Sequence, residues 1–264
     1  MSEYREKEEV FNEKIENLWS LLMTSKKIAV FTGAGVSTLS GIPDFRGKHG
    51  VYNSPWHNLD VETILSYDFF FSHPDIFYKW TEEVWYHLED YKPNIVHNTL
   101  ARMEEKGILK EGVFTQNIDF LHQRAGSKKV WELHGSARYS FCTNCNAFYK
   151  YEEIAPIVQR GEIPYCDKCG SLIKPDIVLY GENLPMSVLR KAETVFSQAD
   201  LTLILGSSLT VYPAASLPKL TSYYGGKVVI VNADPTDQDK NATLIFRDLE
   251  QTFTAINTFL DQIS

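Results

Sequence analysis

The stretch that decides the fold of this chain is IAVFTGAGVSTLSGIPDFRG, residues 28–47. Its apolar start, residues 28–31, predicts a short buried strand, and the glycines that follow predict a turn. Glycines directly after a strand let the backbone approach a pyrophosphate and leave amide N–H groups free to bind it. The same Gly-x-Gly pattern also occurs in turns that merely need small residues, so the motif alone leaves both interpretations open.

The continuation of the motif favours a loop over a helix, because Pro43 and two glycines interrupt residues 40–47. In a lid or recognition loop, Arg46 could meet a phosphate or ribose, and Phe45 could shield a reacting carbon from water. The alternative is a surface turn with a solvated arginine and a core phenylalanine. Thr38 stands where the dinucleotide fingerprint of dehydrogenases has a third glycine, which argues against a hydride-transfer enzyme.

Further apolar runs end, like the first, in small or polar residues. They cover residues 113–115, 129–131, 201–205 and 228–231. This pattern is typical of buried parallel strands that deliver their carboxyl ends to a ligand crevice. Helical stretches over about 96–106 and 186–198 separate the runs, and apolar residues spaced along residues 4–24 predict an amphipathic docking helix. The alternation predicts an open α/β sheet, interrupted by insertions over about 48–95 and 137–175.

The composition excludes several classes of protein. The chain has 264 residues, of which 44% are hydrophobic and 23% charged, as in an ordinary globular protein with one large domain or one domain carrying an insertion. A formal net charge of −8 argues against nucleic acid and anionic lipid as partners. The acidic first thirty residues do not resemble a secretory signal, and no apolar run is long enough to cross a membrane. We therefore expect a soluble, cytoplasmic protein.

All four cysteines lie in two close pairs, Cys142 with Cys145 and Cys166 with Cys169. Four thiolates in two Cys-x-x-Cys pairs suit a tetrahedral zinc ion in a ribbon. Because four protein ligands leave no open position for a substrate, we expect one structural zinc ion and no catalytic one. Two disulfides or four free thiols are the alternatives, and both are less common in an intracellular protein.

Polar residues that follow the predicted strands are candidates for a site. Gln116, Asn117 and Asp119 could pair with the carboxamide and hydroxyls of a ligand, although Asn117 or Asp119 could instead cap the next helix. His134 also follows a strand, where it could take a proton from a ribose hydroxyl near neutral pH. As one of seven histidines, it could equally have a structural role.

Later segments repeat the theme of a strand followed by small polar residues. Residues 206–208 and 231–234 would suit contacts to the second half of a dinucleotide, with turns and caps as the competing explanations. Residues 180–185 and 211–213 could pair with an extended peptide by β-augmentation, although an ordinary loop is the default interpretation.

Taken together, these motifs resemble the sirtuin family of NAD-dependent protein-lysine deacylases. The matching pieces occur in the order of the family: GAGVSTLSGIPDFRG, TQNID, LHG, the paired cysteines, GEN-L-P, GSS and VN, over residues 33–232. A short chain with little beyond these motifs resembles a bacterial, core-only member. The resemblance implies a Rossmann-like large domain of residues 1–47, 96–136 and 176–264, and a small domain made of a helical module, 48–95, and a zinc-ribbon module, 137–175.

The resemblance also implies roles for individual residues. His134 would be the catalytic base and Asn117 would support the ribose region, whereas Val178, Gly181 and Glu182 would line the acyl-peptide tunnel. The residues 246–249, where the family has an adenine contact, match the family pattern poorly. The residues implied in NAD binding are Gly33, Ala34, Gly35, Thr38, Asp44, Phe45, Arg46, Gln116, Ile118, Asp119, His134, Gly206, Ser207, Ser208, Asn232 and Leu249.

The reaction that the resemblance implies is deacetylation of acetyl-lysine proteins or peptides with NAD as co-substrate, producing free lysine, nicotinamide and O-acetyl-ADP-ribose. The acyl oxygen would attack the ribose carbon that bears nicotinamide, and His134 would then deprotonate a ribose hydroxyl. Relatives that prefer succinyl-lysine have Tyr and, three residues later, Arg; here Tyr78 is followed by Thr81, which predicts a neutral acyl group. The alternatives are a protein ADP-ribosyltransferase, a zinc-ribbon binding module without catalysis, and a dehydrogenase.

Overall fold

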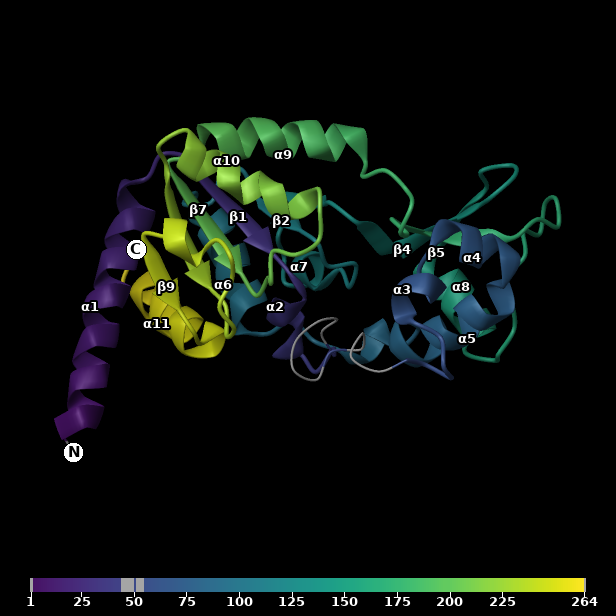
Figure 1. The fold of residues 1–264 in the computed structure, drawn as a ribbon, viewed down its shortest axis with the longest axis horizontal. Coiled ribbons are helices and arrows are strands. Elements are labelled where there is room, and N and C mark those ends of the chain that lie inside the picture. The colour runs from purple at the N-terminus through teal and green to yellow at the C-terminus, as the bar shows by residue number, and fades with distance from the viewer. Residues whose placement is uncertain (1, 44–49, 51–54, 264) are drawn as a thin grey trace.

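The main sheet has six parallel strands and stands at the centre of the larger part of the molecule (Figure 1). The structure is a computed structural model, which describes residues 2–43, 50 and 55–263. The strand order is β3-β2-β1-β7-β8-β9. The strands are β1 (Ile28–Thr32), β2 (Val113–Thr115), β3 (Val130–Glu132), β7 (Leu201–Leu205), β8 (Lys227–Val231) and β9 (Leu244–Phe246).

This order confirms the predicted open α/β sheet and places its switch point at β1. The chain adds β2 and β3 on one side of β1 and then β7, β8 and β9 on the other side. Ligands bind such sheets at the carboxyl ends of the strands where the order reverses. The five predicted strands are all present, whereas the edge strand β9 was not predicted.

Helices cover both faces of this sheet, so that it has two apolar cores. On one face, α1 (Ser2–Thr24), α6 (Ile95–Glu105) and α11 (Leu249–Asp261) pack against Val30, Leu203 and Val229. On the other face, α9 (Met186–Gln198) and α10 (Leu217–Tyr223) pack against alternate residues of the same strands, including Phe31 and Ile204. Because successive strand residues point to opposite faces, strands of unbroken apolar sequence can fill both cores.

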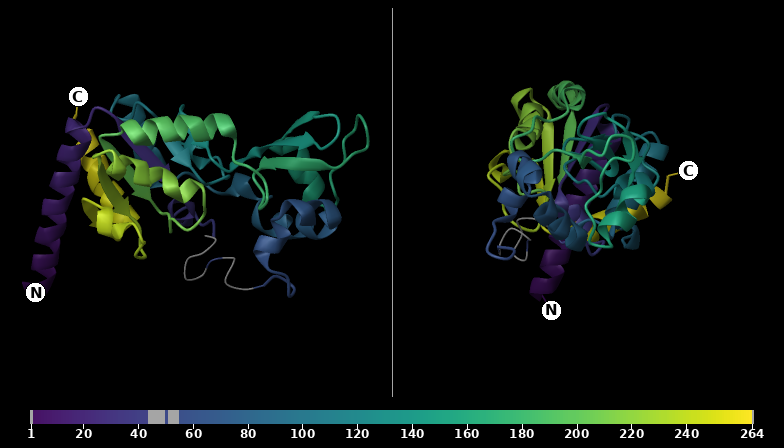
Figure 2. Two further views of the ribbon diagram at one scale, coloured as in Figure 1. Left: turned by 45° about the horizontal axis from the view of Figure 1, so that its top comes forward. Right: turned by 90° about the vertical axis from the view of Figure 1, so that its right-hand side faces the viewer.

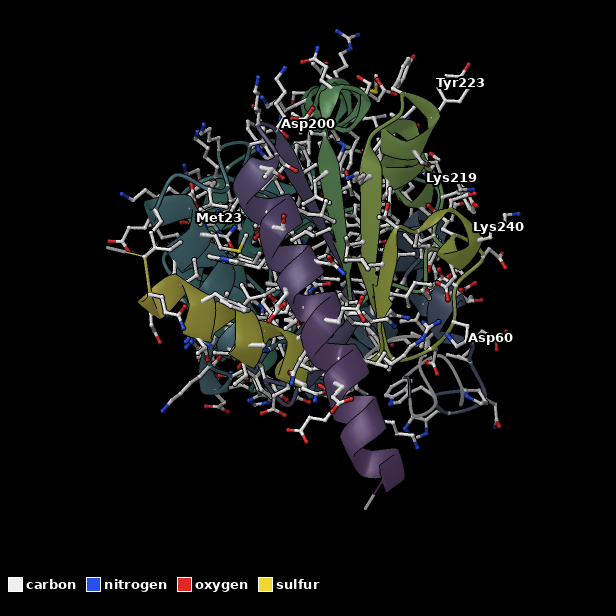
Figure 3. The ribbon with its side chains drawn as sticks, turned by 90° about the vertical axis from the view of Figure 1, so that its left-hand side faces the viewer. Met23, Asp60, Asp200, Lys219, Tyr223 and Lys240 are labelled. Atoms are coloured by element: carbon white, nitrogen blue, oxygen red, sulfur yellow. The ribbon has the colours of Figure 1, made fainter. Side chains whose placement is uncertain are left out.

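The predicted N-terminal helix is present as α1, at the end of the molecule far from the smaller part (Figure 2). Ile15, Leu18 and Leu22 are buried on its sheet-facing side, as their spacing predicts. The carboxylate of Asp200 accepts hydrogen bonds from the backbone amides of Lys26 and Lys27, 2.9 and 3.0 Å long. Figure 3 shows α1 crossing this end of the molecule, with Met23 on its last turn and Asp200 at the edge of the strands. The helix therefore closes the core at this end of the molecule.

The smaller part combines a three-stranded antiparallel sheet with short helices. The sheet has the order β5-β4-β6, and Phe70, Phe77 and Trp80 of the helices share a core with Ile154 and Ile173 of the ribbon side. The elements are β4 (Gly135–Cys142), β5 (Phe148–Lys150), β6 (Ile173–Ile177), α3 (Val61–Ile64), α4 (Tyr67–Ser72), α5 (Pro74–Val84), η2 (Leu88–Asp90) and α8 (Tyr151–Val158). No helix in the described part of the chain has the length and apolar character needed to cross a membrane.

The four cysteines of the ribbon converge on one point. Their sulfur atoms all lie within 4.8 Å of one another, with Cys142 Sγ 3.4 Å from Cys169 Sγ and Cys145 Sγ 3.6 Å from Cys166 Sγ. These distances are too long for disulfides. A tetrahedral zinc ion with Zn–S bonds of about 2.3 Å places its sulfur ligands about 3.8 Å apart. The cluster therefore fits a four-coordinate structural zinc ion, as its spacing predicts.

We expect purified protein to contain about one zinc ion per chain, and its removal to lower the thermal unfolding midpoint by about 10 °C, because the ion links β4 to the loop before β6. Elemental analysis and scanning calorimetry, before and after treatment with a chelator and a thiol reagent, measure both quantities. Cys145→Ser should reproduce the loss, whereas Asn144→Ser, a change at the neighbouring exposed position, should not. A chelated protein that unfolds like the untreated one would contradict the assignment.

A pair of buried histidines lies beneath the carboxyl end of β1. The rings of His97 on α6 and His122 on α7 (Leu121–Arg124) are 4.7 Å apart, and His122 Nε2 is 3.1 Å from Thr32 Oγ1. His97 Nδ1 accepts the backbone N–H of Asn94 and closes the capping box of α6. Burial lowers the pKa of His97 to about 4, and burial followed by the neighbouring His97 holds the pKa of His122 well below its ordinary value. Both rings are therefore neutral at pH 7.

This pair should make the protein sensitive to acid. Below pH 6.5 the unfolded chain binds protons at these histidines and the folded one does not, so stability should fall as the pH drops from 6.5 to about 4. The part due to His97 is on the order of 3 kcal/mol. Urea unfolding at several pH values should show a flatter decline for His97→Gln, and an unchanged decline for the exposed control His87→Gln. Equal slopes in all three proteins would contradict this assignment.

Candidate active site

A cavity of about 310 Å³ opens at the carboxyl ends of the central strands, between the main sheet and the smaller part of the molecule. It lies at the switch point of the sheet, where a ligand is expected. Most of the residues predicted for the site line it. They are Gly33, Ala34, Gly35, Gln116, Asn117, Ile118, His134, Val178, Gly181, Glu182, Gly206, Ser207, Ser208 and Asn232.

Six predicted site residues do not appear among those that line the cavity. Asp44, Phe45 and Arg46 lie outside the described residues. Thr38 ends the short helix α2 (Ala34–Thr38), where its hydroxyl donates to the carbonyl of Gly35. The other two are Asp119, which is buried below the cavity floor, and Leu249, which begins α11. Their roles in binding remain predictions.

The glycine turn after β1 packs directly on the end of β7. A Cβ atom at Gly35 would lie 2.8 Å from the Cα of Gly206, and one at Gly33 would lie 2.7 Å from the carbonyl oxygen of Gly206. Gly206 itself has φ +57, and a Cβ there would lie 2.4 Å from the amide nitrogen of Val36. Any side chain at these positions would push the two strand ends apart.

This packing corrects one sequence-based expectation. The amides of the glycine turn were expected to be free for a phosphate, but Gly33 N–H donates to Leu205 and Gly35 N–H donates to Gly206, at 3.0 and 2.8 Å. Among the described residues, Ala34 N–H is the amide of this turn that makes no such bond. The glycines therefore serve first to join the ends of β1 and β7. A ligand would find the amide of Ala34 available rather than several consecutive amides.

A buried polar network lies under this turn. Asn117 Nδ2 donates to the carbonyl of Gly33 and to Ser37 Oγ, both at 3.0 Å, and Ser37 Oγ donates to Asp119 at 2.5 Å. The other carboxylate oxygen of Asp119 accepts the amide of Leu121 at the start of α7. Burial raises the pKa of Asp119, and these two hydrogen bonds oppose the shift. Asp119 thus accepts the first amide of α7 from the position before the N-cap residue, Phe120, and is not itself the cap. Asn117 ties the strand end of β2 to the glycine turn.

His134 lies in the turn between β3 and β4 and lines the cavity. Its Nδ1 is 3.1 Å from the carbonyl oxygen of Gln116. Because a carbonyl can only accept, this contact puts the proton on Nδ1, and the neutral ring then carries its lone pair on Nε2. The backbone carbonyl of His134 accepts from Val178 N–H, which attaches the histidine to the segment that leaves β6. The arrangement suits a general base.

The side chains of Gln116, after β2, and Ser207, after β7, hold each other in place through a hydrogen bond. Gln116 N–H donates to the carbonyl of Thr32, and its side-chain amide donates to Ser207 Oγ at 2.9 Å. This pair spans the space between β2 and β7 above the end of β1. Gln116 therefore orients His134 through its carbonyl while its side chain fixes the wall of the cavity.

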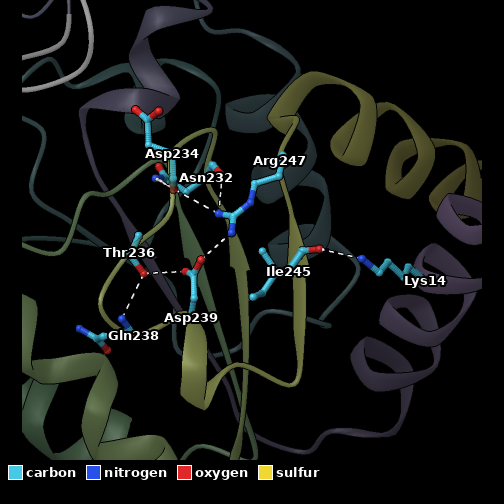
Figure 4. A network of polar contacts seen from close by, with 8 residues as sticks. All are labelled: Lys14, Asn232, Asp234, Thr236, Gln238, Asp239, Ile245 and Arg247. Atoms are coloured by element: carbon cyan, nitrogen blue, oxygen red, sulfur yellow. Dashed lines mark hydrogen bonds and ion pairs between the residues drawn. The ribbon is translucent and has the colours of Figure 1, made fainter. Parts of the chain in front are cut away.

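The loop after β8 is held in place by Arg247. Its guanidinium donates to the carbonyls of Asn232 and Asp234 at 3.3 and 3.1 Å and pairs with Asp239 at 2.5 Å (Figure 4). Thr236 Oγ1 donates to the other oxygen of Asp239. The network fixes the loop whose residues Asn232 and Asp234 line the cavity. Sequence reasoning recorded Arg247 only as part of a poorly matching segment and missed this function.

The opposite wall is an extended segment, residues 178–182, that pairs with the helical side of the smaller part. Tyr180 N–H donates to Leu65, and Tyr67 N–H donates to Tyr180, each at 2.9 Å. The carboxylate of Glu182 accepts the amide of Leu179 at 2.8 Å and pairs with Lys174 at 2.9 Å. Glu182 therefore closes a turn in this wall, in addition to lining the cavity.

Apolar residues form much of the lining. Leu184, Val211, Tyr212 and Pro213 belong to the segments 180–185 and 211–213, which were expected to pair with a peptide. Leu65, Trp85, Ile177 and Leu179 were missed, because nothing in their local sequence distinguishes them from ordinary core residues. Among the described residues of the lining there is no lysine or arginine. Tyr78 and Thr81 are buried outside the lining, and the Tyr78 hydroxyl donates to the carbonyl of Ile173.

Comparison with known proteins gives a consistent result. The model of the Sir2 family matches residues 33–213, more than half of the chain. The NAD-dependent protein deacetylase of Thermotoga maritima is 48% identical over 231 residues, which cover 88% of this chain and 92% of that protein. The NAD-dependent protein deacetylase of Clostridium acetobutylicum is 41% identical over 237 residues, covering 89% and 94%.

Solved structures agree in both fold and sequence. A Sir2 structure with a deacetylated p53 peptide and 3'-O-acetyl ADP ribose has a TM-score of 0.88 and 44% identity, covering 93% of this chain and 98% of that one. Sir2 with a p53 peptide and NAD+ has a TM-score of 0.84 and 44% identity, covering 94% and 98%. The strand-end cavity, the cysteine cluster and these matches lead to one conclusion: the chain belongs to the Sir2 family of sirtuins.

Proposed function

We propose that this chain removes acetyl groups from lysine side chains of proteins or peptides in an NAD-dependent reaction that yields free lysine, nicotinamide and O-acetyl-ADP-ribose. The observation that carries the proposal is the position of His134. Its ring lines the cavity between the strand ends and the extended segment 178–182, with Nδ1 held by the carbonyl of Gln116. The Sir2-family relatives named as NAD-dependent protein deacetylases support the same activity.

The residues of the cavity fit NAD as co-substrate. Ala34 supplies an amide at the strand end, Ser207 and Ser208 supply hydroxyls, and Asn232 lies on the loop after β8. Amides, hydroxyls and side-chain amides are the groups that bind the phosphates and ribose hydroxyls of a dinucleotide at a switch point. NAD supplies an activated ribose carbon with nicotinamide as its leaving group. The chain has to place the acyl oxygen against that carbon and keep water away.

In this reaction His134 accepts a proton from a ribose hydroxyl at Nε2. The Gln116 carbonyl stabilises the resulting imidazolium, because Nδ1–H continues to donate to it. Asn117 keeps the floor of the site rigid through Gly33 and Ser37. The apolar residues Leu65, Trp85 and Ile118 enclose the reacting atoms and exclude water.

Two broader predictions belong with this function. We propose that the boundaries of the two domains follow the sequence prediction, with 48–95 and 137–175 as the small domain, because the cavity is lined from both sides of that division. Limited proteolysis tests these boundaries.

We also propose a cytoplasmic location, since zinc-binding thiolates persist in a reducing compartment. Cell fractionation tests the location.

His134→Ala should lower deacetylation of an acetyl-lysine peptide by at least about 10²-fold while NAD still binds, because the variant loses the base and keeps the other cavity residues at the strand ends. Mass spectrometry of the peptide with and without NAD measures the reaction, and calorimetry measures NAD binding. His87→Ala, a change at an exposed histidine, is the matched control. A variant that keeps most of its turnover would remove His134 from this role. Transfer of ADP-ribose to the protein or peptide would favour the transferase alternative.

The absence of lysine and arginine among the described lining residues predicts the acyl group. Acetyl-lysine peptide should be processed at least about tenfold faster than succinyl-lysine peptide, because a carboxylate would be buried without a cation among the described lining residues. Butyryl-lysine peptide is the control for chain length, since it has the same number of carbons as succinyl-lysine and no charge. Kinetics with the three peptides measure the preference. Faster turnover of the succinyl peptide than of the butyryl peptide would contradict the assignment.

A further inference from the structure

A second cavity, of about 710 Å³, lies where three parts of the chain meet, and it shares no lining residue with the first. Arg124 of α7 contributes to it from the side of the main sheet, and Arg138 of β4 and Lys150 at the end of β5 contribute from the ribbon. Figure 1 shows β4 at the junction between the two parts. Cavities of this size at the junction of structural units are typical small-molecule sites.

The charged groups of this cavity differ in the hydrogen bonds and ion pairs that they make. The carboxylate of Glu89 accepts hydrogen bonds from the Tyr151 hydroxyl at 2.6 Å and from Gln159 at 2.8 Å. A second carboxylate, Glu152, is on the exposed rim. The three cations come from different elements, and within the described residues no carboxylate lies within ion-pair distance of Lys150. Arg124 donates to the carbonyls of Leu88 and Glu89, and Arg138 pairs loosely with Glu132. Lys150 is therefore the cation of this cavity whose side chain has no such partner among the described residues.

Arg138 is the most informative of these cations. Its Nε is buried and has no hydrogen-bond partner among the described residues. Its Nη2 lies 3.6 Å from Glu132, which is a loose ion pair, and its guanidinium stacks 4.8 Å over the ring of Tyr139. A buried guanidinium N–H without a partner is unfavourable. The rest of the Arg138 side chain, which is 33% exposed, can donate to an anionic oxygen, the acceptor that matches its planar fork best.

One part of the cavity wall is aromatic and apolar. Phe120 and Tyr151 contact each other with ring centroids 5.8 Å apart, and Pro156 lines the same cavity. Phe120 has φ 51 and ψ 21, a left-handed conformation that a bulky residue adopts only when its surroundings demand it. Two residues before it, Ile118 lines the reaction cavity. A ligand against Phe120 would therefore touch the chain segment that connects the two cavities.

We propose that this second cavity is a binding site for a small molecule that joins an anionic head, a carboxylate or phosphate, to a flat apolar body. The head pairs with Arg138 and Lys150, and the body lies between Phe120, Tyr151 and Pro156. Such a ligand contacts α7 and the ribbon at once, so it would link the two parts of the molecule at a distance from the NAD site.

Phenyl phosphate and phenylacetate are suitable probes, because both have an anionic head on an aromatic ring. Calorimetry is carried out on the whole zinc-containing protein in saturating ADP-ribose, so that the reaction cavity is filled. We expect binding that weakens by about tenfold in Lys150→Gln and in Arg138→Gln, and that stays unchanged in Lys128→Gln, an exposed lysine elsewhere. Arg138→Lys, which keeps the charge and loses the fork, should weaken binding less than Arg138→Gln.

Phenol and inorganic phosphate separate the two parts of the ligand, and each alone should bind more weakly than phenyl phosphate. Crystals soaked in 4-bromophenyl phosphate would locate the bromine by its anomalous signal, which does not depend on any variant or on activity. Tighter binding of phenyl phosphate than of phenylacetate would favour a phosphate head, and the reverse would favour a carboxylate. Affinities that are equal in all variants, loss of binding when ADP-ribose is added, or bromine found elsewhere would overturn the proposal.

Discussion

The contact between the glycine turn after β1 and the end of β7 is the constraint on which the rest of the structure depends. Gly35 N–H donates to the carbonyl of Gly206 at 2.8 Å, and a Cβ on either residue would clash with the backbone of the other. The contact brings two strand ends together at the point where the order of the sheet reverses. It also explains why glycines occur there although the amides of Gly33 and Gly35 already donate hydrogen bonds. The two backbones have to approach each other closely, and the ligand site forms on the geometry that results.

From this contact the site is assembled through shared partners. Asn117 joins the end of β2 to the glycine turn, and Gln116 joins β2 to Ser207 after β7 while its carbonyl orients His134. The tautomer of the proposed base is thus a consequence of the sheet, since the strand that presents Gln116 also supplies the acceptor for Nδ1. A general base held in this way loses little entropy when it reacts, because its orientation is already set before the substrate binds.

The smaller part of the molecule completes the cavity from the other side. The ends of its helices supply Leu65 and Trp85, and its own core includes Cys142 and Cys166 of the cysteine cluster. The segments 118–120 and 135–138 connect the two parts, with Ala137 N–H donating to the carbonyl of Ile118 at 3.1 Å. The second cavity, whose lining includes Phe120 and Arg138, lies beside these same segments. The parts of the chain that set the geometry of the reaction cavity are therefore also those that a ligand at Arg138 would contact.

The sequence by itself determined the elements whose signal is local. Unbroken apolar runs predicted the strands through Ile28, Val113 and Leu201, the spacing of Ile15, Leu18 and Leu22 predicted α1, and the cysteine pairs predicted the zinc cluster, because each depends on residues close together in the chain. Only the tertiary structure decided that Gly33 and Gly35 meet Gly206, that Arg247 holds the loop of Asn232, and that Leu65 and Trp85 enclose the reaction cavity. These contacts join residues far apart in the sequence, and an apolar or glycine residue has the same local pattern whether it faces a core, a second strand or a ligand.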